Sequence, residues 1–299
     1  MKAAGYVGRF APSPTGRLHM GSLVAAVASW CDARHAQGIW RLRMEDLDPP
    51  REVHGAAGDI LRTLEGFGLH WDGPVLYQSS RDEAYSKALE LLKGSGAAFG
   101  CACTRKTLQG HEVYPGNCRH GFQPGQSARS YRFAFDEEEG EWTDEVQGRR
   151  PWNSREMGDF VIKRADGFWA YQLAVVVDDL HQGITDVVRG ADLIDSTPRQ
   201  LALRRALDPD ADDIRWAHLP LLVNEAGQKL SKQTLAAPIE LEHAPELLMA
   251  ALKVLGQVKS GDKEPRELVE SRDTKGLLQW ACQHWQLSQV PSGSVHWQG

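Results

Sequence analysis

The stretch RFAPSPTGRLHMGSLVAAV, residues 9–27, places two prolines, two glycines and a histidine directly before an apolar run. A helix N-terminus exposes unpaired backbone N–H groups and the positive end of the helix dipole, which favour a phosphate. Glycine lets a ligand approach the backbone, proline stiffens the incoming loop, and His19 adds a donor. The stretch therefore predicts a phosphate site. The alternative is a tight strand-to-helix turn with a capping role only.

Three of the five cysteines, Cys101, Cys103 and Cys118, form a cluster in the sequence. In a reducing compartment, thiolates spaced in this way favour zinc over disulfides. The spacing leaves the fourth ligand open among His111, Tyr114 and His120, and histidine is the commoner ligand. A site with four protein ligands would be structural, whereas the alternative is three reduced packing cysteines. Cys31 and Cys282 stand alone and are expected to be packing residues.

The elements around the first motif predict an α/β fold. Residues 6–10 and 39–46 have strand patterns, and the apolar residues of 19–38 recur at helical spacing. A strand, helix and strand in this order form a βαβ unit, for which a parallel sheet is expected. Two more helices are expected at 57–69 and 80–96.

Further along, cysteines, glycines and prolines interrupt the pattern, and 99–153 is expected to be an inserted module whose acidic run at 136–145 is a solvated loop. Residues 159–179 are expected to form two strands around a turn at Asp166–Gly167. A helix is expected at 196–207, then a strand, a turn and a polar loop over 218–233, and a mainly helical end. The expected division is 1–98 and 154–236 for the catalytic domain, 99–153 for the insert and 237–299 for the helical region.

The composition is typical of a globular protein, with 41% hydrophobic and 25% charged residues. A net charge of −6 argues against non-specific nucleic-acid binding over the whole surface, although a local basic face stays compatible with it. No apolar run reaches the roughly 18 residues of a membrane span. The N-terminus lacks the apolar core of a signal peptide, so a cytoplasmic protein is expected.

The motif PSPTGRLHMGS resembles the HIGH signature of class I aminoacyl-tRNA synthetases, in the form of the glutamyl and glutaminyl branch. KLSKQ, residues 229–233, resembles the second signature, KMSKS, at about the expected distance. The segment YQLAVVVDDLHQGITDVVRGADLIDSTPRQ also resembles the glutamyl branch. The resemblance runs from about Tyr6 to Ala236. It implies a Rossmann-like catalytic domain with a parallel sheet, an inserted zinc-binding module and a short helical C-terminal region.

The resemblance also implies roles for individual residues. The implied catalytic residues are His19, Gly21 and Lys232. The implied ATP-binding residues are Pro12, His19, Gly21, Ser22, Lys229, Ser231 and Lys232, with Mg²⁺ held largely by phosphates and water. The implied glutamate-binding residues are Arg9, Ser13, Glu45, Tyr171 and Arg189. The planar fork of arginine suits the two carboxylates of glutamate, and Glu45 suits the ammonium group. Taken singly, these residues could equally be surface charges, core or salt-bridge residues.

Within the family, the resemblance is closest to the truncated paralogues of glutamyl-tRNA synthetase, the glutamyl-Q tRNA(Asp) synthetases. Only about 65 residues follow KLSKQ, too few for an anticodon-binding domain. The short proteins carry a cysteine, cysteine, tyrosine, cysteine pattern, which implies Tyr114 as the fourth zinc ligand. They activate glutamate without tRNA and attach it to queuosine in the anticodon loop of tRNA(Asp). The implied partners are ATP, L-glutamate and the tRNA(Asp) anticodon stem-loop, and a monomer is expected.

Three other functions are compatible with the sequence. An ordinary glutamyl-tRNA synthetase would charge the tRNA 3′ end. A small-molecule adenylate-forming ligase would use the nucleotide site without RNA. A non-catalytic tRNA-binding paralogue would have no physical need to keep His19, Gly21, Lys229 and Lys232 together.

Overall fold

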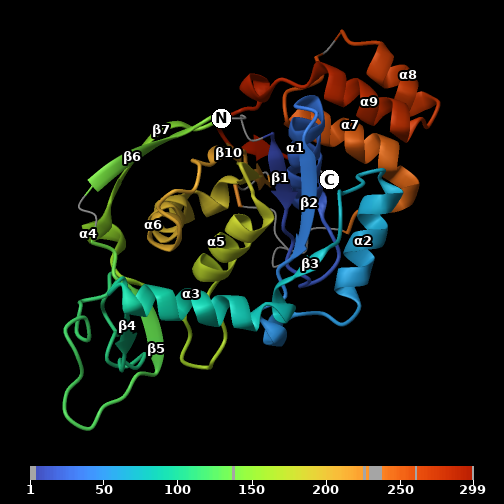
Figure 1. Ribbon diagram of the computed structural model, residues 1–299. Coiled ribbons are helices and arrows are strands. Elements are labelled where there is room, and N and C mark those ends of the chain that lie inside the picture. Colours follow the sequence, from blue (N-terminus) through green and yellow to red (C-terminus); the bar gives the residue numbers. More distant parts are fainter. Residues whose placement is uncertain (1–4, 137–138, 225–226, 229–237, 260, 298–299) are drawn as a thin grey trace.

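Parallel strands carry the N-terminal part of the fold, in a computed structural model that describes residues 5–136, 139–224, 227–228, 238–259 and 261–297 (Figure 1). Strand β1 (Val7–Phe10) pairs in parallel with β2 (Ile39–Met44), which pairs in parallel with β3 (Leu76–Tyr77). Helix α1 (Met20–His35) connects β1 to β2. The predicted βαβ unit is therefore confirmed.

A second sheet continues this layer in the order β7-β6-β10-β9. Its strands are β6 (Glu139–Asp144), β7 (Gly148–Asn153), β9 (Asp186–Gly190) and β10 (Arg215–Leu219). Strand β10 runs parallel to both β9 and β6. The N–H of Thr185, just before β9, donates to the carbonyl of Val7 at 3.0 Å, which brings β9 beside β1. The carboxyl ends of β1, β9 and β10 therefore lie near one another.

Helices cover these strands, and β1, β9 and β10 are buried along most of their length. The remaining helices are α2 (Ala56–Gly66), α3 (Asp82–Gly94), α4 (Ser154–Met157), α5 (Tyr171–Gln182), α6 (Thr197–Leu207), α7 (Ala244–Val254), α8 (Glu264–Glu270) and α9 (Thr274–His284). One core cluster joins α1, β2 and α7 through residues such as Leu23, Trp40 and Leu252, all with no solvent exposure. Cys31 lies buried in the same cluster, as a packing residue. The C-terminal region is helical as expected: α7 and α9 pack against α1, and α8 packs against α7 and α9 (Figure 1).

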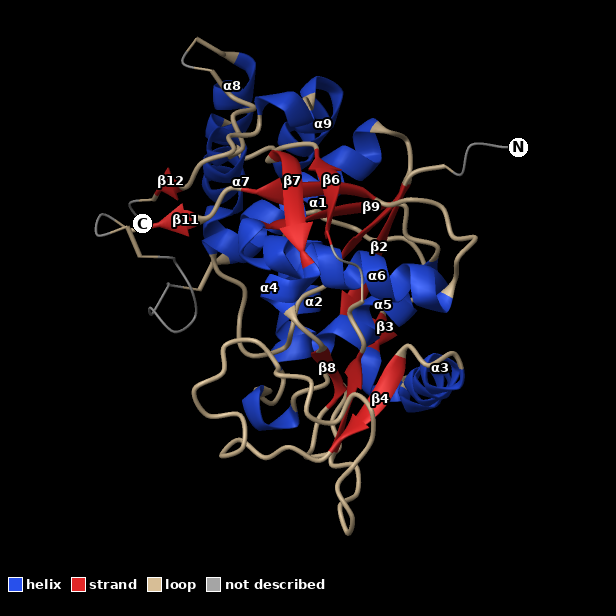
Figure 2. Ribbon diagram, turned by 90° about the vertical axis from the view of Figure 1, so that its left-hand side faces the viewer, coloured by secondary structure: helices blue, strands red, loops and turns tan. Residues whose placement is uncertain are grey.

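A small antiparallel sheet lies at the opposite end of the molecule from α8 and α9 (Figure 2). It consists of β4 (Ala98–Cys101), β5 (Ser130–Phe133) and β8 (Phe160–Lys163), with β5 in the middle. A fourth, two-stranded sheet pairs β11 (Leu222–Val223) with β12 (Val295–His296). The three clustered cysteines lie on β4 and on the loops that follow it.

Two predictions of local structure are wrong. The acidic run is not a solvated loop, because residues 139–144 form β6 and Trp142 and Asp144 face the interior. The turn at Asp166–Gly167 is confirmed, with the N–H of Gly167 donating to the carbonyl of Arg164 at 3.1 Å. However, the valine-rich run after it is helix α5 and not a second strand. Strand propensity is a weak preference, and burial of this segment against a second core overrides it.

Among the described residues, no helix is both long enough and apolar enough to cross a membrane.

Candidate active site

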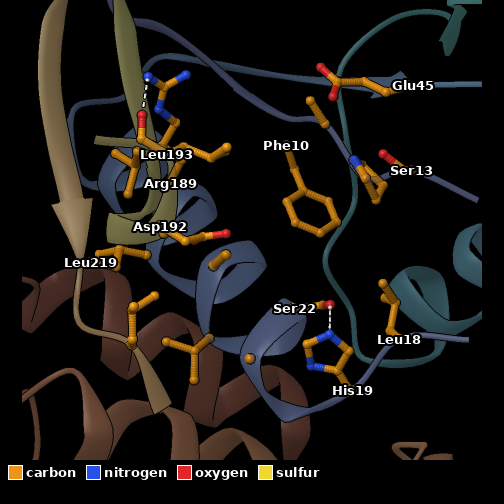
Figure 3. A pocket seen from close by; sticks show the side chains of 18 of the residues that line it. Phe10, Ser13, Leu18, His19, Ser22, Glu45, Arg189, Asp192, Leu193 and Leu219 are labelled. Carbon is orange, nitrogen blue, oxygen red and sulfur yellow. Dashed lines mark hydrogen bonds between the residues drawn. The ribbon is translucent and has the colours of Figure 1, made fainter. Parts of the chain in front are cut away.

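A cavity of about 770 Å³ lies at the carboxyl ends of β1, β9 and β10, beside the N-terminus of α1 (Figure 3). Ligands of open α/β sheets bind at this edge. The cavity is lined by every residue that was predicted to bind ATP or glutamate and that the structure describes: Arg9, Pro12, Ser13, His19, Gly21, Ser22, Glu45, Tyr171 and Arg189. The predicted residues Lys229, Ser231 and Lys232 lie outside the described residues.

At one end of the cavity, the first turn of α1 faces the space where a phosphate could bind. His19 occupies the N-cap position, Gly21 and Ser22 line the cavity, and the first turn holds no acidic residue. The Oγ of Ser22 lies 3.2 Å from Nε2 of His19 (Figure 3). This end therefore offers backbone N–H groups, a hydroxyl and an imidazole to an anion.

Main-chain hydrogen bonds fix the proline-containing loop in front of this helix. The carbonyl of Pro12 accepts from the N–H of Glu45 at 3.0 Å, and the carbonyl of Pro14 accepts from the N–H of Val53 at 3.0 Å. The loop therefore holds the N-terminus of α1 and Glu45 in a constant relative position.

The chain on both sides of residues 229–237 lies at this cavity. Before this range, Leu222 lines the cavity. After it, Pro238 forms an antiparallel bridge with His19, and the N–H of Ile239 donates to the carbonyl of Leu18 at 3.1 Å. The described residue Leu222 before this range lines the cavity, and Pro238 after it pairs with the residue that caps α1.

At the other end of the cavity, two arginines share one buried carboxylate. Oδ1 of Asp179 accepts from an Nη of Arg43 at 2.7 Å and from Nε of Arg9 at 3.4 Å. In the described part of the chain, Arg9 donates to no other protein group, so its two Nη groups are available to a ligand in the cavity. A guanidinium with two free Nη groups can hold a carboxylate bidentately.

Glu45 and Asp192 both line the cavity, and Glu45 is the carboxylate next to Arg43. Burial raises its pKa to about 7, even though the neighbouring Arg43 and Arg9 favour the ionised form. In contrast, Arg43 and Arg9 outweigh burial at Asp179 and lower the pKa of that carboxyl. Asp179 is therefore ionised and paired with the two arginines. Among the residues that the structure describes, Glu45 has no such close partner and can bind a cation such as an ammonium group.

Arg189 lies on the opposite side of the cavity from Glu45, and only 5% of its surface is exposed (Figure 3). All five of its N–H groups have protein acceptors. Nε donates to Nε2 of His218 at 2.9 Å. The two Nη groups donate to Tyr171 Oη at 3.3 Å, Gln200 Oε1 at 2.8 Å, Leu193 O at 3.2 Å and Thr197 Oγ1 at 2.9 Å.

This arrangement assigns different work to the two cavity arginines. Because Tyr171 accepts from Arg189, its own O–H can point to a second acceptor, such as a carboxylate in the cavity. Arg189 then supplies charge and orients Tyr171, while Arg9 supplies free donors.

The sequence analysis did not identify several residues that build this end. These residues contact the predicted ligand residues on the side away from the cavity, or contact one another there. They are Arg43, Asp179, Thr197, Gln200 and His218. Arg43 stands in a strand pattern beside Glu45, and its type inside an otherwise apolar strand was the available signal. Nothing local distinguishes His218 from any other strand residue.

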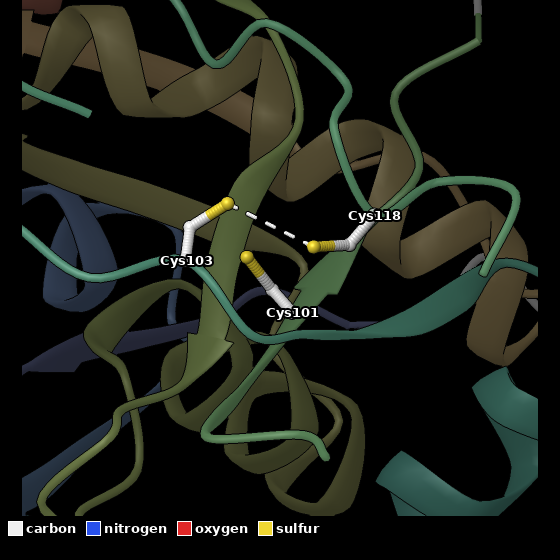
Figure 4. A group of neighbouring side chains, drawn as sticks. All are labelled: Cys101, Cys103 and Cys118. Carbon is white, nitrogen blue, oxygen red and sulfur yellow. Dashed lines mark hydrogen bonds between the residues drawn. The ribbon is translucent and has the colours of Figure 1, made fainter. Parts of the chain in front are cut away.

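The three clustered cysteines also come together in space (Figure 4). Their sulfurs lie within 4.8 Å of one another, with Cys103 and Cys118 at 3.7 Å. Four ligands around a zinc ion with Zn–S bonds of about 2.3 Å would place sulfurs about 3.8 Å apart. The cluster therefore fits a metal ion of this kind. Among the described residues, no histidine or carboxylate completes the group.

The hydroxyl of Tyr114 lies beside the sulfurs of this group. Its Oη lies 3.4 Å from Sγ of Cys101 and 3.9 Å from Sγ of Cys103. Burial of Cys101 opposes ionisation, but hydrogen bonds from Tyr114 and Arg132 outweigh it and lower the pKa of the thiol to about 7. Arg132 also lies over the Tyr114 ring, 3.9 Å from its centroid, where its positive charge would offset that of the thiolates.

Residues 6–284 match the catalytic domain of the class I tRNA synthetases (E and Q). The chain belongs to this family. It is thus an enzyme of the ligase class and resembles glutamate–tRNA synthetases in function. The match covers the residues that line the cavity and the cysteine module, by which we mean the small sheet β4-β5-β8 and the loops that carry Cys101, Cys103 and Cys118.

Curated relatives are similar over almost their whole length. A protein of Chromobacterium violaceum named glutamyl-Q tRNA(Asp) synthetase is 54% identical, over 99% of this chain and 98% of its own. A protein of the same name from Dechloromonas aromatica is 51% identical over 97% of both chains.

Solved structures have the same fold. The glutamate–tRNA synthetase of Elizabethkingia anophelis superposes with a TM-score of 0.80, at 22% identity, over 99% of this chain and 68% of that protein. The glutamate–tRNA ligase of Elizabethkingia meningosepticum, solved with its amino acid, has a TM-score of 0.79 at 22% identity, over 98% and 67% of the two chains. The α/β fold with its parallel sheet, cysteine module and helical C-terminal region is therefore the class I catalytic fold.

Proposed function

We propose that this enzyme activates L-glutamate with ATP to glutamyl-adenylate without requiring tRNA, and transfers the glutamate to queuosine in the anticodon loop of tRNA(Asp). One observation carries the first half of this proposal. A single cavity joins a helix N-terminus with His19 and Ser22 at one end to Arg9, Glu45 and Tyr171 at the other. The acceptor rests on the printed name of the relatives.

Adenylate formation needs orientation and charge stabilisation more than proton chemistry. The α-carboxylate of glutamate attacks the α-phosphorus of ATP, a P–O bond forms, and pyrophosphate leaves with the electrons of the broken bond. The helix N-terminus and His19 hold phosphate oxygens, and Lys232 neutralises charge on the leaving group. Mg²⁺ that accompanies ATP supplies further neutralisation.

The charges of the pocket favour glutamate over glutamine. The ammonium group pairs with Glu45, and the carboxylates take the Nη groups of Arg9 and the hydroxyl of Tyr171, beside the charge of Arg189. A neutral amide at the side-chain position would leave part of this buried positive charge unpaired, which is a strong basis for rejection.

Zinc in the cysteine module would be structural. Cys101, Cys103, Cys118 and Tyr114 would fill four positions and leave none for a substrate. The module lies at the end of the molecule opposite α8 and α9 (Figure 2), and none of these four residues lines the cavity.

The decisive experiment is ATP–pyrophosphate exchange with glutamate and a panel of other amino acids, first without tRNA. Exchange with glutamate alone supports the proposal. Exchange that appears only with tRNA would favour an ordinary glutamyl-tRNA synthetase, and silence under both conditions would favour a non-catalytic paralogue.

The acceptor is tested with labelled glutamate and tRNA(Asp) that lacks its 3′-terminal adenosine. Label should enter this tRNA when it contains queuosine, and should not enter a queuosine-free transcript. Labelling that instead needs the intact 3′ end would replace the proposed acceptor. Glutamate-dependent exchange with no RNA labelling at all would favour a small-molecule ligase.

A further inference from the structure

A buried chain of three side chains leads from the cavity to strand β6 of the second sheet. Arg189 Nε donates to Nε2 of His218 at 2.9 Å, and Nδ1 of His218 lies 2.6 Å from Oδ2 of Asp144. The side chains of His218 and Asp144 have no solvent exposure. Asp144 ends the strand β6 that the sequence analysis took for a solvated loop.

The partners of His218 determine which of its nitrogens carries the proton. Arginine can only donate, so Nε2 of His218 must accept from Arg189. Thr197 Oγ1 also lies 3.3 Å from this nitrogen and already accepts from Arg189, so its hydroxyl can donate to Nε2. Nδ1 therefore carries the proton and donates it to Asp144. Burial also lowers the pKa of His218, in keeping with a neutral ring.

The two oxygens of Asp144 have separate roles. Oδ1 accepts from three backbone N–H groups, those of Val146 at 3.0 Å, Gln147 at 2.8 Å and His218 at 3.1 Å. Oδ2 faces Nδ1 of His218. The three backbone donors fix the carboxylate, and through it the ring of His218.

We propose that Asp144 and His218 are positioning residues for glutamate binding: Asp144 holds His218 in the tautomer whose Nε2 accepts from Arg189, and this acceptor orients Arg189 and, through it, the hydroxyl of Tyr171. The proposal rests on the proposed glutamate pocket and extends it to a strand that does not line the cavity. The rings of Trp216 and Trp142 pack against His218, whose side chain has no solvent exposure, so water is not a ready substitute for its Nε2 as acceptor.

The variant Asp144→Asn tests the proposal because its amide can adopt only one orientation. The three backbone donors require the amide oxygen at the Oδ1 position, so the NH₂ group must face His218. The ring then has to carry its proton on Nε2, where it opposes the Nε–H of Arg189. The KM for glutamate should rise about tenfold or more, the order expected for an unsatisfied buried hydrogen bond.

Three readouts separate positioning from a general structural defect. The KM for ATP in the same exchange assay should stay unchanged in Asp144→Asn. Asp159→Asn is the matched control, because Asp159 is also buried and accepts from the backbone N–H of Phe135 but does not line the cavity. It should leave the KM for glutamate unchanged. Equal increases of both KM values in Asp144→Asn would overturn the proposal.

His218→Gln completes a double-mutant cycle. A glutamine can place its amide oxygen near the position of Nε2 and accept from Arg189 without help from Asp144. The KM of this variant for glutamate should be close to that of the wild type. Adding Asp144→Asn to His218→Gln should raise this KM only slightly. If Asp144→Asn costs as much in this background as alone, Asp144 does not act through His218.

If Asp144→Asn does not fold, His218→Gln and His218→Leu decide the question. Only the leucine variant lacks an acceptor for Arg189. The KM for glutamate should therefore rise in His218→Leu and not in His218→Gln. Equal KM values for glutamate in the two variants would overturn the proposal. Absence of glutamate-dependent exchange in the wild type would refute the proposed function itself. An active wild type with unchanged KM in Asp144→Asn would refute only the positioning role.

Discussion

Nε of Arg43 lies 3.7 Å from Oε1 of Glu45, two residues further along the chain, at the carboxyl end of β2. Arg43 is fully buried and gives its shorter contact, 2.7 Å, to Asp179. Asp179 thus already neutralises Arg43, the cation nearest to Glu45. The charge of Glu45 is available to a ligand, and because the group is buried its pKa is raised.

Glutamate binding should therefore depend on pH near neutrality. The pKa of Glu45 is about 7, so the ammonium partner is lost as the pH falls through this value. The KM for glutamate should rise as the pH is lowered from 8 to 6. Below pH 6 it should rise by about tenfold per pH unit, which is the steepest dependence that the uptake of one proton can give. Glu45→Gln should have a high KM that no longer varies with pH. A flat profile for the wild type would remove Glu45 from the ammonium site.

Arg189→Ala should raise the KM for glutamate on the order of a hundredfold, because hydrogen bonds to a charged group are lost and Tyr171 is no longer oriented. It should also lower the melting temperature, since Gln200, Thr197 and His218 lose their donor. Arg204→Ala is the matched control, because Arg204 bonds to the carbonyl of Asp212 and does not line the cavity. An unaltered glutamate requirement in Arg189→Ala would place the pocket elsewhere.

Purified protein should contain about one zinc per chain, and a chelator that removes it should lower the melting temperature. Tyr114→Phe should bind zinc more weakly in competition with a chromogenic chelator, because the Oη near Cys101 and Cys103 is missing. His111→Ala and His120→Ala should bind zinc like the wild type. The reverse ranking would make a histidine the fourth ligand.

Lys232→Ala should reduce glutamyl-adenylate formation by about a hundredfold or more, the cost of removing one donor to developing charge. The melting temperature should not change. Lys253→Ala, on the exposed side of α7, is the control for removal of a lysine charge. Normal adenylate formation in Lys232→Ala would exclude this residue from the phosphate site.

Much of the site could be predicted because its residues stand in short motifs. The proline-containing loop, His19 and Gly21 are linked by local geometry to the start of α1, so their spacing predicts a helix end that could receive an anion. Glu45 was singled out by the family resemblance from among the carboxylates that follow β2. The cysteine spacing also predicted that the three sulfurs would meet, although it left the fourth ligand open.

Contacts between distant segments could not be predicted in this way. The run after Gly167 has the β-branched residues of a strand but forms α5, because its burial in the second core decides its conformation. Residues 139–144 have the charge of a loop but form β6, because Trp142 and Asp144 find buried partners on β10.

The sequence by itself determined the family, the βαβ unit with its helix-end motif, and the residue types that line the cavity. Only the tertiary structure decided that Asp179 neutralises Arg9 and Arg43 while Glu45 stays available, and that Asp144 reaches Arg189 through His218. The physical reason is the distance along the sequence over which the contacts are made. A motif fixes the positions of residues that are neighbours along the chain, whereas the order of strands in the sheet brings Asp144, Arg189 and His218 together from three separate strands.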